Sequence, residues 1–307
     1  MRAYRPGCLN FKGVRVLPPP TLFYIPYAFL RVMTRGARAR RPRWLSSFEG
    51  FVRTCALRDL RVWTKYLGFK VSMTLEGLVD LSPVVFSPAY ESAEKELVSH
   101  IKPEVAIDVG AHLGSFTFLL ARYARVVVAV EPDPRAAGTL ASNISANGLR
   151  NVIVFPYACS SSDGKELGFK LERGVTSRVV QSGGDVAVKS ITVDAIVEAL
   201  RLERVGFLKV DVEGHELEVL RGAQNTLRRH RPALLVELWL KNAGEEEELL
   251  QRLGYRLARV LTKHAIGVEN RLYLPQELPL NQLQRPRVVY LSAFHEVKQG
   301  VSKPPCT

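Results

Sequence analysis

Two acidic residues near the middle of the chain have the spacing of a nucleotide-binding crevice. Asp108 opens the pattern Asp108-x-Gly110-x-x-x-Gly114, and Glu131 lies 21 residues after Gly110. Glycine permits a tight turn and a close backbone approach to a ligand, and an acid at the end of the next strand can bind ribose hydroxyls. An aspartate in place of the first glycine of G-x-G-x-x-G suits a cationic ligand better than a pyrophosphate. We therefore predict a cofactor site at Asp108, Gly110, Gly114 and Glu131.

Two residues at this site have a structural alternative. Glu131 could instead be a helix N-cap or a surface carboxylate. His112 lies inside the glycine turn, where it either contacts the cofactor or caps the following helix. We keep both among the cofactor-binding candidates, Glu131 because its separation from Gly110 matches that of a strand-end crevice, and His112 because it lies in the turn itself.

A second group of candidates follows a later apolar run, in the segment KVDVEGHE (209–216). A carboxylate or an imidazole within hydrogen-bond reach can accept the proton of a hydroxyl nucleophile. Asp211, Glu213 and His215 are therefore the predicted catalytic residues, with Asp211 or Glu213 as base or orienting group. The alternative for Glu213 is a helix-capping acid favoured by the helix dipole.

Three further acids near these residues are treated separately. Glu216 and Glu218 fall in the first turn of the predicted helix, where we expect solvated side chains. Glu237 ends another apolar run and points to the same strand-end crevice. Together with Asp211 and Glu213 it has the oxygen donors of a metal site, but no ligand spacing demands one, and we predict no metal.

Apolar runs alternate with amphipathic segments from residue 91 onward, which predicts a mainly parallel sheet covered by helices on both faces. The segment 160–190 interrupts the alternation and, with Gly164, Gly174, Gly183 and Gly184, indicates a hairpin and a mobile loop. We expect strands at 105–109, 126–130, 152–158, 207–210, 233–238, 255–261, 271–274 and 288–291, and helices at 91–100, 115–123, 135–147, 192–200, 216–230 and 245–253.

The region before this alternation is different in composition. Apolar residues in 44–67 recur at helical spacing and predict one or two cap helices, and 71–86 indicates short strands. The predicted organisation is a basic N-terminal arm (1–43), a cap region (44–90), the main domain (91–292) and a tail (293–307).

Several of these segments resemble the class I S-adenosylmethionine (SAM) methyltransferases, and more narrowly the FkbM family. The resemblance covers about residues 84–275 and leaves out the first 80 residues and the tail. LKVDVEGHELEVLRGA (208–223) is its most specific segment. The other matching segments are VAIDVGAHLGSFT (105–117), residues 128–147 with Glu131-Pro-Asp-Pro, and ITVD (191–194).

The resemblance implies a Rossmann-like α/β fold with about seven strands, the last one antiparallel. It implies that Asp108, Gly110 and Gly114 line the methionine side of the SAM site, that Glu131 holds the ribose, and that residues near Ala158 approach the adenine. It also implies a methyltransferase that uses SAM and acts on a hydroxyl of a sugar, glycan or small metabolite. The alternatives are an RNA methyltransferase and a non-catalytic binding module of the same fold.

The net charge of +13 is confined to the N-terminal quarter of the chain. Residues 1–70 carry 15 Lys and Arg against two acids, whereas 71–307 carries 28 of each sign. The basic arm could hold nucleic acid phosphates, but a neutral main domain makes that partner the weaker expectation. Apolar and aromatic residues beside an arginine cluster in 21–43 instead suggest contact with an anionic membrane surface, and the alternative is a solvated basic arm or an extension packed on the protein.

The four cysteines show neither metal-ligand nor redox spacing, since no two lie within four residues of each other. Reduced thiols are typical of the cytoplasm. We therefore expect a cytoplasmic protein that contacts the membrane surface peripherally at most. The sequence does not predict an oligomeric state.

Overall fold

The computed structural model describes residues 10–11, 14–15, 61–74, 92–172, 177–180, 182–241, 243–264, 267–278 and 289–291. The chain divides into two compact units, Met1–Ser87 and Pro88–Thr307. Among the described residues, no helix has the length and apolar composition needed to cross a lipid bilayer.

The described part of the first unit consists of two antiparallel strand pairs. β1 (Asn10–Phe11) pairs with β2 (Val14–Arg15), and β3 (Arg61–Tyr66) pairs with β4 (Phe69–Thr74). The helix predicted over 44–67 is therefore wrong at 61–66, and the rest of that prediction lies outside the described residues. The turn explains the strand pairing, because Leu67 and Gly68 both have positive φ, as a two-residue type I′ hairpin turn requires.

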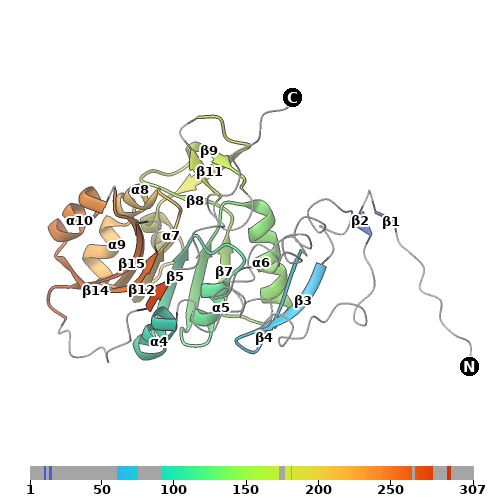
Figure 1. The fold of residues 1–307 in the computed structure, drawn as a ribbon, viewed down its shortest axis with the longest axis horizontal. Helices are drawn as coiled ribbons and strands as arrows, with labels where there is room; N and C mark the ends of the chain where they lie inside the picture. The colour runs from blue at the N-terminus through green and yellow to red at the C-terminus, as the bar shows by residue number, and fades with distance from the viewer. Residues whose placement is uncertain are drawn as a thin grey trace, which may run out of the picture. The chain divides into compact units, whose positions relative to one another are not determined.

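The second unit is built on an eight-stranded sheet in its described residues, with the order β16-β14-β15-β13-β12-β5-β6-β7 (Figure 1). β15 runs antiparallel to both of its neighbours, and the other pairings in the sheet are parallel. The strands are β5 (Val105–Val109), β6 (Val126–Val130), β7 (Val152–Phe155), β12 (Val205–Val210), β13 (Ala233–Trp239), β14 (Tyr255–His264), β15 (Val268–Pro275) and β16 (Val289–Leu291). This confirms the predicted fold class, with β16 as one strand more than the expected seven.

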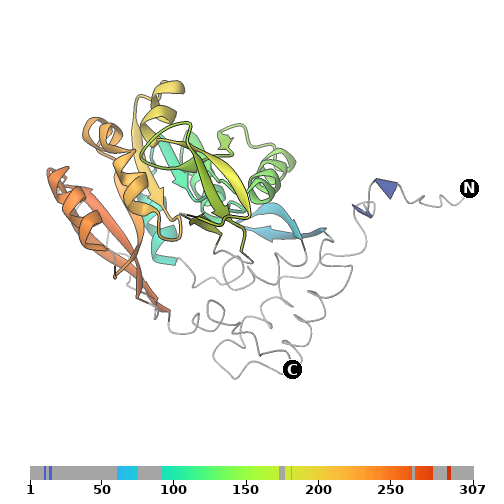
Figure 2. The same ribbon diagram turned by 90° about the horizontal axis from the view of Figure 1, so that it is seen from above.

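Helices cover both faces of this sheet (Figure 2). On one face, Phe116 of α5 stacks on Phe207 of β12 at 6.1 Å between ring centroids. On the other face, Leu208 shares one hydrophobic cluster with Val219 and Leu227 of α8 and α9. The helices are α4 (Ser92–Ile101), α5 (Ser115–Ala121), α6 (Pro134–Ala146), α7 (Val193–Ala199), α8 (Glu216–Arg221), α9 (Gln224–His230) and α10 (Ala243–Arg252).

The helix predicted over 216–230 is two helices, and the break has a packing cause. A Cβ atom on Gly222 would stand 2.0 Å from the carbonyl oxygen of Ser160, so only glycine fits at this position. The second helix then begins afresh, since the Asp194 carboxylate accepts hydrogen bonds from the backbone N–H groups of Asn225 (3.0 Å) and Thr226 (2.7 Å). Asp194 thus caps α9.

The third predicted strand, 152–158, also divides. β7 stays in the large sheet, whereas β8 (Ala158–Cys159) joins a small separate sheet of order β10-β9-β11-β8, seen at the top of Figure 1. The other members are β9 (Glu166–Lys170), β10 (Arg178–Val180) and β11 (Val186–Ile191). These strands confirm the hairpin expected within 160–190, although 173–176 and 181 lie outside the described residues.

Candidate functional site

The site lies at the carboxyl ends of three neighbouring strands, and Glu131 is fixed at the end of the first of them, β6. Both of its carboxylate oxygens accept backbone hydrogen bonds, from His112 N and from Asp133 N, each at 2.7 Å. Only 5% of Glu131 is exposed, and burial raises the pKa of its carboxyl to about 7 despite these two donors. Glu131 is therefore neither a surface carboxylate nor the N-cap, because Asp133 is the N-cap of α6.

Asp108 lies in β5 with no solvent exposure. Its Oδ2 accepts a hydrogen bond from Thr117 Oγ1 at 2.6 Å, whereas its buried Oδ1 has no hydrogen-bond partner. Burial raises the pKa of this carboxyl, and the nearby Lys209 ammonium opposes the shift. A buried carboxylate oxygen without a hydrogen-bond donor costs free energy of folding. The Oδ1 atom of Asp108 can therefore accept a hydrogen bond from a ligand or pair with a cation.

Gly110 and Gly114 shape the turn between Asp108 and α5, but through contacts within the protein. A Cβ on Gly110 would stand 1.8 Å from the carbonyl oxygen of Asp211, and a Cβ on Gly114 would stand 2.3 Å from Leu140 Cδ1. Both have positive φ. We expected the backbone at Gly110 to approach a ligand closely. In the structure it closely approaches the loop that follows β12.

Lys209 is a buried cation at this edge that sequence reasoning had not singled out. Its Nζ lies 2.9 Å from Asp211 Oδ2 and 3.8 Å from Asp108 Oδ1, and 5.4 Å from the ring centroid of Phe116. The sequence signal was available, because a lysine two residues before an aspartate interrupts an otherwise apolar strand.

Glu216 holds the loop between β12 and α8, contrary to the prediction of a solvated acid. Its side chain is 2% exposed, and its Oε1 accepts hydrogen bonds from Val212 N (3.2 Å) and Gly214 N (2.9 Å). Burial raises the pKa of Glu216 to about 7.

Glu213 has a positive φ of 57° in this loop, a strained conformation for a residue with a side chain. Glu218 is partly exposed and bonds Ser161 Oγ and Arg221.

The structure brings Asp211, Glu213 and Glu237 together. One carboxylate oxygen from each lies within 4.8 Å of the other two, and Glu237 is the most buried of the three. Oxygen donors at this separation can bind a cation or accept hydrogen bonds from hydroxyl groups. The three acids lie together at one edge of the sheet, as their positions at strand ends predicted.

The two predicted histidines have distinct surroundings. His112 has a positive φ of 49° in the glycine turn, and burial lowers the pKa of its imidazole to about 4. His215 lies at the N-cap position of α8 without a side-chain capping bond, and its Nε2 is 3.0 Å from Ser160 Oγ. Burial lowers the pKa of His215 as well. His215 is not part of the three-carboxylate group.

Ala158 lies in β8, and its side chain packs against Phe169 and Val188. Contact with a cofactor would therefore have to come from its backbone. The neighbouring Cys159 is a buried free thiol whose pKa burial raises, which makes it a packed residue and not a nucleophile.

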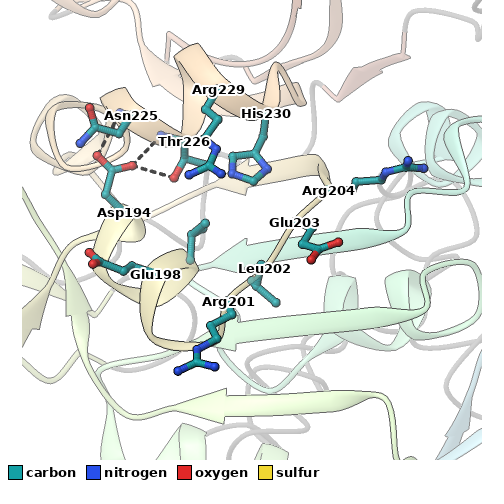
Figure 3. A pocket seen from close by; sticks show the side chains of 11 residues that line it. Asp194, Glu198, Arg201, Leu202, Glu203, Arg204, Asn225, Thr226, Arg229 and His230 are labelled. Carbon is teal, nitrogen blue, oxygen red and sulfur yellow. Dashed lines mark hydrogen bonds between the residues drawn. The ribbon is translucent and has the colours of Figure 1, made fainter.

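A pocket of ≈ 870 Å³ lies away from these residues, at the other end of β12 (Figure 3). Asp194 points there toward Asn225 and Thr226, the residues whose helix it caps, and none of the predicted catalytic or cofactor residues lines the pocket. Its wall carries three acids and three arginines, with His230 beside them, which favours no single charge of ligand. The lining residues are Asp194, Val197, Glu198, Arg201, Leu202, Glu203, Arg204, Asn225, Thr226, Arg229 and His230.

Known proteins are similar in sequence to the region that contains this site. Residues 108–257 match the family model of the methyltransferase FkbM domain. Hexuronic acid methyltransferase AglP of Haloferax volcanii is 27% identical over 194 residues, covering 62% of this chain and 77% of AglP. Methyltransferase sdnD of Sordaria araneosa is 28% identical over 192 residues, covering 50% of this chain and 74% of sdnD. The resemblance inferred from the sequence is confirmed.

A solved structure is also similar. The crystal structure of methyltransferase FkbM from Methylobacillus flagellatus KT is 18% identical with a TM-score of 0.43, and the match covers 56% of this chain and 44% of that chain.

Proposed function

Because this chain carries a methyltransferase FkbM domain over residues 108–257, we propose that it transfers a methyl group from SAM to a hydroxyl of a sugar, glycan or small metabolite. The observation that carries the proposal is that Asp108, Glu131 and Asp211 meet at the carboxyl ends of three adjacent parallel strands. Ligands of open α/β sheets bind at that edge.

The buried acids fit a cationic cofactor with a ribose. Asp108 has a buried oxygen without a hydrogen-bond partner, which suits a cationic donor on the cofactor. Glu131 is oriented by two backbone N–H groups, and each of its oxygens retains a lone pair for a ribose hydroxyl. Gly110, Gly114 and His112 would form the turn beneath the cofactor, and the backbone at Ala158 would face the adenine.

SAM supplies an activated methyl group on a sulfonium, so the protein's main contribution is to align a nucleophile with it. Asp211 and Glu213 are the residues proposed to accept the hydroxyl proton of the acceptor or to orient that hydroxyl. His215 is a weaker candidate, since its ring faces Ser160. Because burial lowers the pKa of His215, its imidazole is neutral and keeps one nitrogen that can accept a proton.

The acceptor class is supported by the chemistry of the carboxylate group and by a relative. Three carboxylates with oxygens within 4.8 Å of one another offer several hydrogen-bond acceptors to the hydroxyl groups of a polyol. AglP, which shares 27% identity, is named as a hexuronic acid methyltransferase.

No metal is assigned. The predicted membrane contact of 21–43 lies outside the described residues and remains a prediction, as does a cytoplasmic location.

The proposal can be tested with methyl-labelled SAM. The purified protein is incubated with p-nitrophenyl glucoside, with p-nitrophenyl glucuronide, and with the glycan, lipid and RNA fractions of a host extract. Label in a glycoside or in the glycan or lipid fraction, lost in Asp211→Asn, is the expected result. Label in RNA alone would favour the RNA methyltransferase. Absence of SAM binding in calorimetry would favour the non-catalytic module.

A further inference from the structure

Lys209 occupies an unusual position for a lysine. Its side chain is 8% exposed, and it lies in β12 between Asp108 of β5 and Asp211 at the strand's end. Asp108 and Lys209 are direct register partners, and Asp211 comes directly after β12, two residues on from Lys209. All three side chains therefore project from the same face of the sheet, the face covered by Phe116 of α5.

Burying an ammonium is unfavourable unless it is paired, and the pairing here is specific. The 2.9 Å contact to Asp211 Oδ2 is a charge-assisted hydrogen bond, whereas the 3.8 Å separation from Asp108 Oδ1 is an ion pair without a hydrogen bond. The Phe116 ring at 5.4 Å covers the ammonium on another side. Lys209 thus bonds to the residue on the acceptor side and leaves the Asp108 oxygen on the cofactor side available.

Asp211 has reason to need such an anchor. It is 28% exposed in its side chain, and an oxygen of Glu213 and one of Glu237 lie within 4.8 Å of its own. Like charges at that distance repel, so a carboxylate without a cationic partner would turn toward solvent. The Lys209 ammonium opposes that movement from the side of the sheet.

We propose that Lys209 is a positioning residue for methyl transfer, which acts by holding the Asp211 carboxylate toward the acceptor hydroxyl. This rests on the proposed function. Lys209 itself does not touch the reacting atoms in this scheme, and no proton moves to or from it. Its loss should lower turnover more than SAM affinity, because Lys209 donates a hydrogen bond to Asp211.

The test replaces the ammonium and then restores it. Lys209→Met keeps the length of the side chain without its charge. Lys209→Cys, alkylated with 2-bromoethylamine, regains an ammonium at nearly the original reach. Wild type treated with the same reagent controls for alkylation of the four native cysteines. The kcat, the KM for the p-nitrophenyl glycoside methylated by wild type, and the Kd for SAM are measured for each, with circular dichroism melting curves.

Lys209→Met is expected to lower kcat by at least about 10-fold with a SAM Kd changed by less than about 3-fold. Alkylated Lys209→Cys should regain most of the kcat relative to the unmodified variant, which also decides the case if Lys209→Met does not fold. Unchanged kcat in both unmodified variants, or no gain on alkylation, would overturn the inference. A wild type that binds SAM but methylates no acceptor would overturn the proposed function instead, and this inference with it.

Discussion

Gly110 packs directly against the carbonyl group of Asp211, so closely that a Cβ atom at position 110 would stand 1.8 Å from that oxygen. The same two loops are joined by a hydrogen bond from Asp211 N to Val109 O at 3.1 Å. The turn that ends β5 and the loop that ends β12 are therefore one packed unit. The cofactor side and the acceptor side of the proposed site must consequently move or stay together.

Gly110→Ala should destabilise the protein and disrupt SAM binding, because the added methyl would force these two loops apart. Gly148→Ala is the matched control, since Gly148 also has positive φ but a Cβ added to it would meet no atom within 4 Å. The control should cost about 1–2 kcal/mol from the backbone conformation alone, and Gly110→Ala at least about 2 kcal/mol more. Equal free energies of unfolding for the two variants would contradict the packing argument.

Asp211→Asn should lower kcat by about 100-fold or more with little change in the Kd for SAM, because an amide cannot accept the hydroxyl proton. Glu213→Gln is measured beside it, as Glu213 is the other candidate base. If Glu213→Gln lost turnover while Asp211→Asn retained it, the role would pass to Glu213. Steady-state kinetics and calorimetry on both variants decide between them.

SAM affinity should increase from about pH 6 to about pH 8, since the pKa of Glu131 is about 7 and an ionised carboxylate is the stronger acceptor for ribose hydroxyls. Glu131→Gln should weaken binding and flatten this dependence. Calorimetric titration across the pH range provides the measurement. A Glu131→Gln protein with wild-type affinity at pH 8 would remove Glu131 from the ribose site.

Glu216→Ala should lower the free energy of unfolding by about 2–4 kcal/mol, because the N–H groups of Val212 and Gly214 lose their common acceptor. Glu216→Gln keeps a carbonyl acceptor and should lose less. Glu248→Ala, at an exposed position of α10, controls for the loss of an acid. In denaturant unfolding, Glu216→Ala should be the least stable of the three variants. Equal free energies of unfolding for Glu216→Ala and Glu248→Ala would exclude the loop-holding role.

Glu216 should also contribute to the pH dependence of stability. Its pKa rises on folding from an ordinary 4.5 to about 7, so its neutral form is the one favoured in the folded state. The associated stability is fully present below about pH 4.5 and is lost as the pH rises through about 7. Glu216→Gln, neutral throughout, should show a smaller decrease in the free energy of unfolding over that interval.

Local patterns predicted most of the second unit. The strands at 105–109 and 126–130 begin and end where the sequence places them, because parallel strands covered on both faces read as continuous apolar runs. The first strand of the hairpin at 61–74 was missed, since apolar residues at helical spacing outweighed the Leu67–Gly68 turn, whereas a strand was predicted from 71 onward. The break at Gly222 was missed as well, because its cause is the backbone of Ser160, 62 residues away in the chain.

The amino-acid sequence alone predicted the class of fold, the resemblance to the FkbM family, and the candidate acids Asp108, Glu131 and Asp211, because residue types and spacings along one strand-helix unit are local properties. How these residues are held depends on the tertiary structure. The ammonium of Lys209 between two strands, the burial of Glu216 beneath its own loop, and the meeting of Glu237 with Asp211 all join groups whose distance depends on strand order and register. Those depend on how the whole apolar core packs, which no single segment specifies.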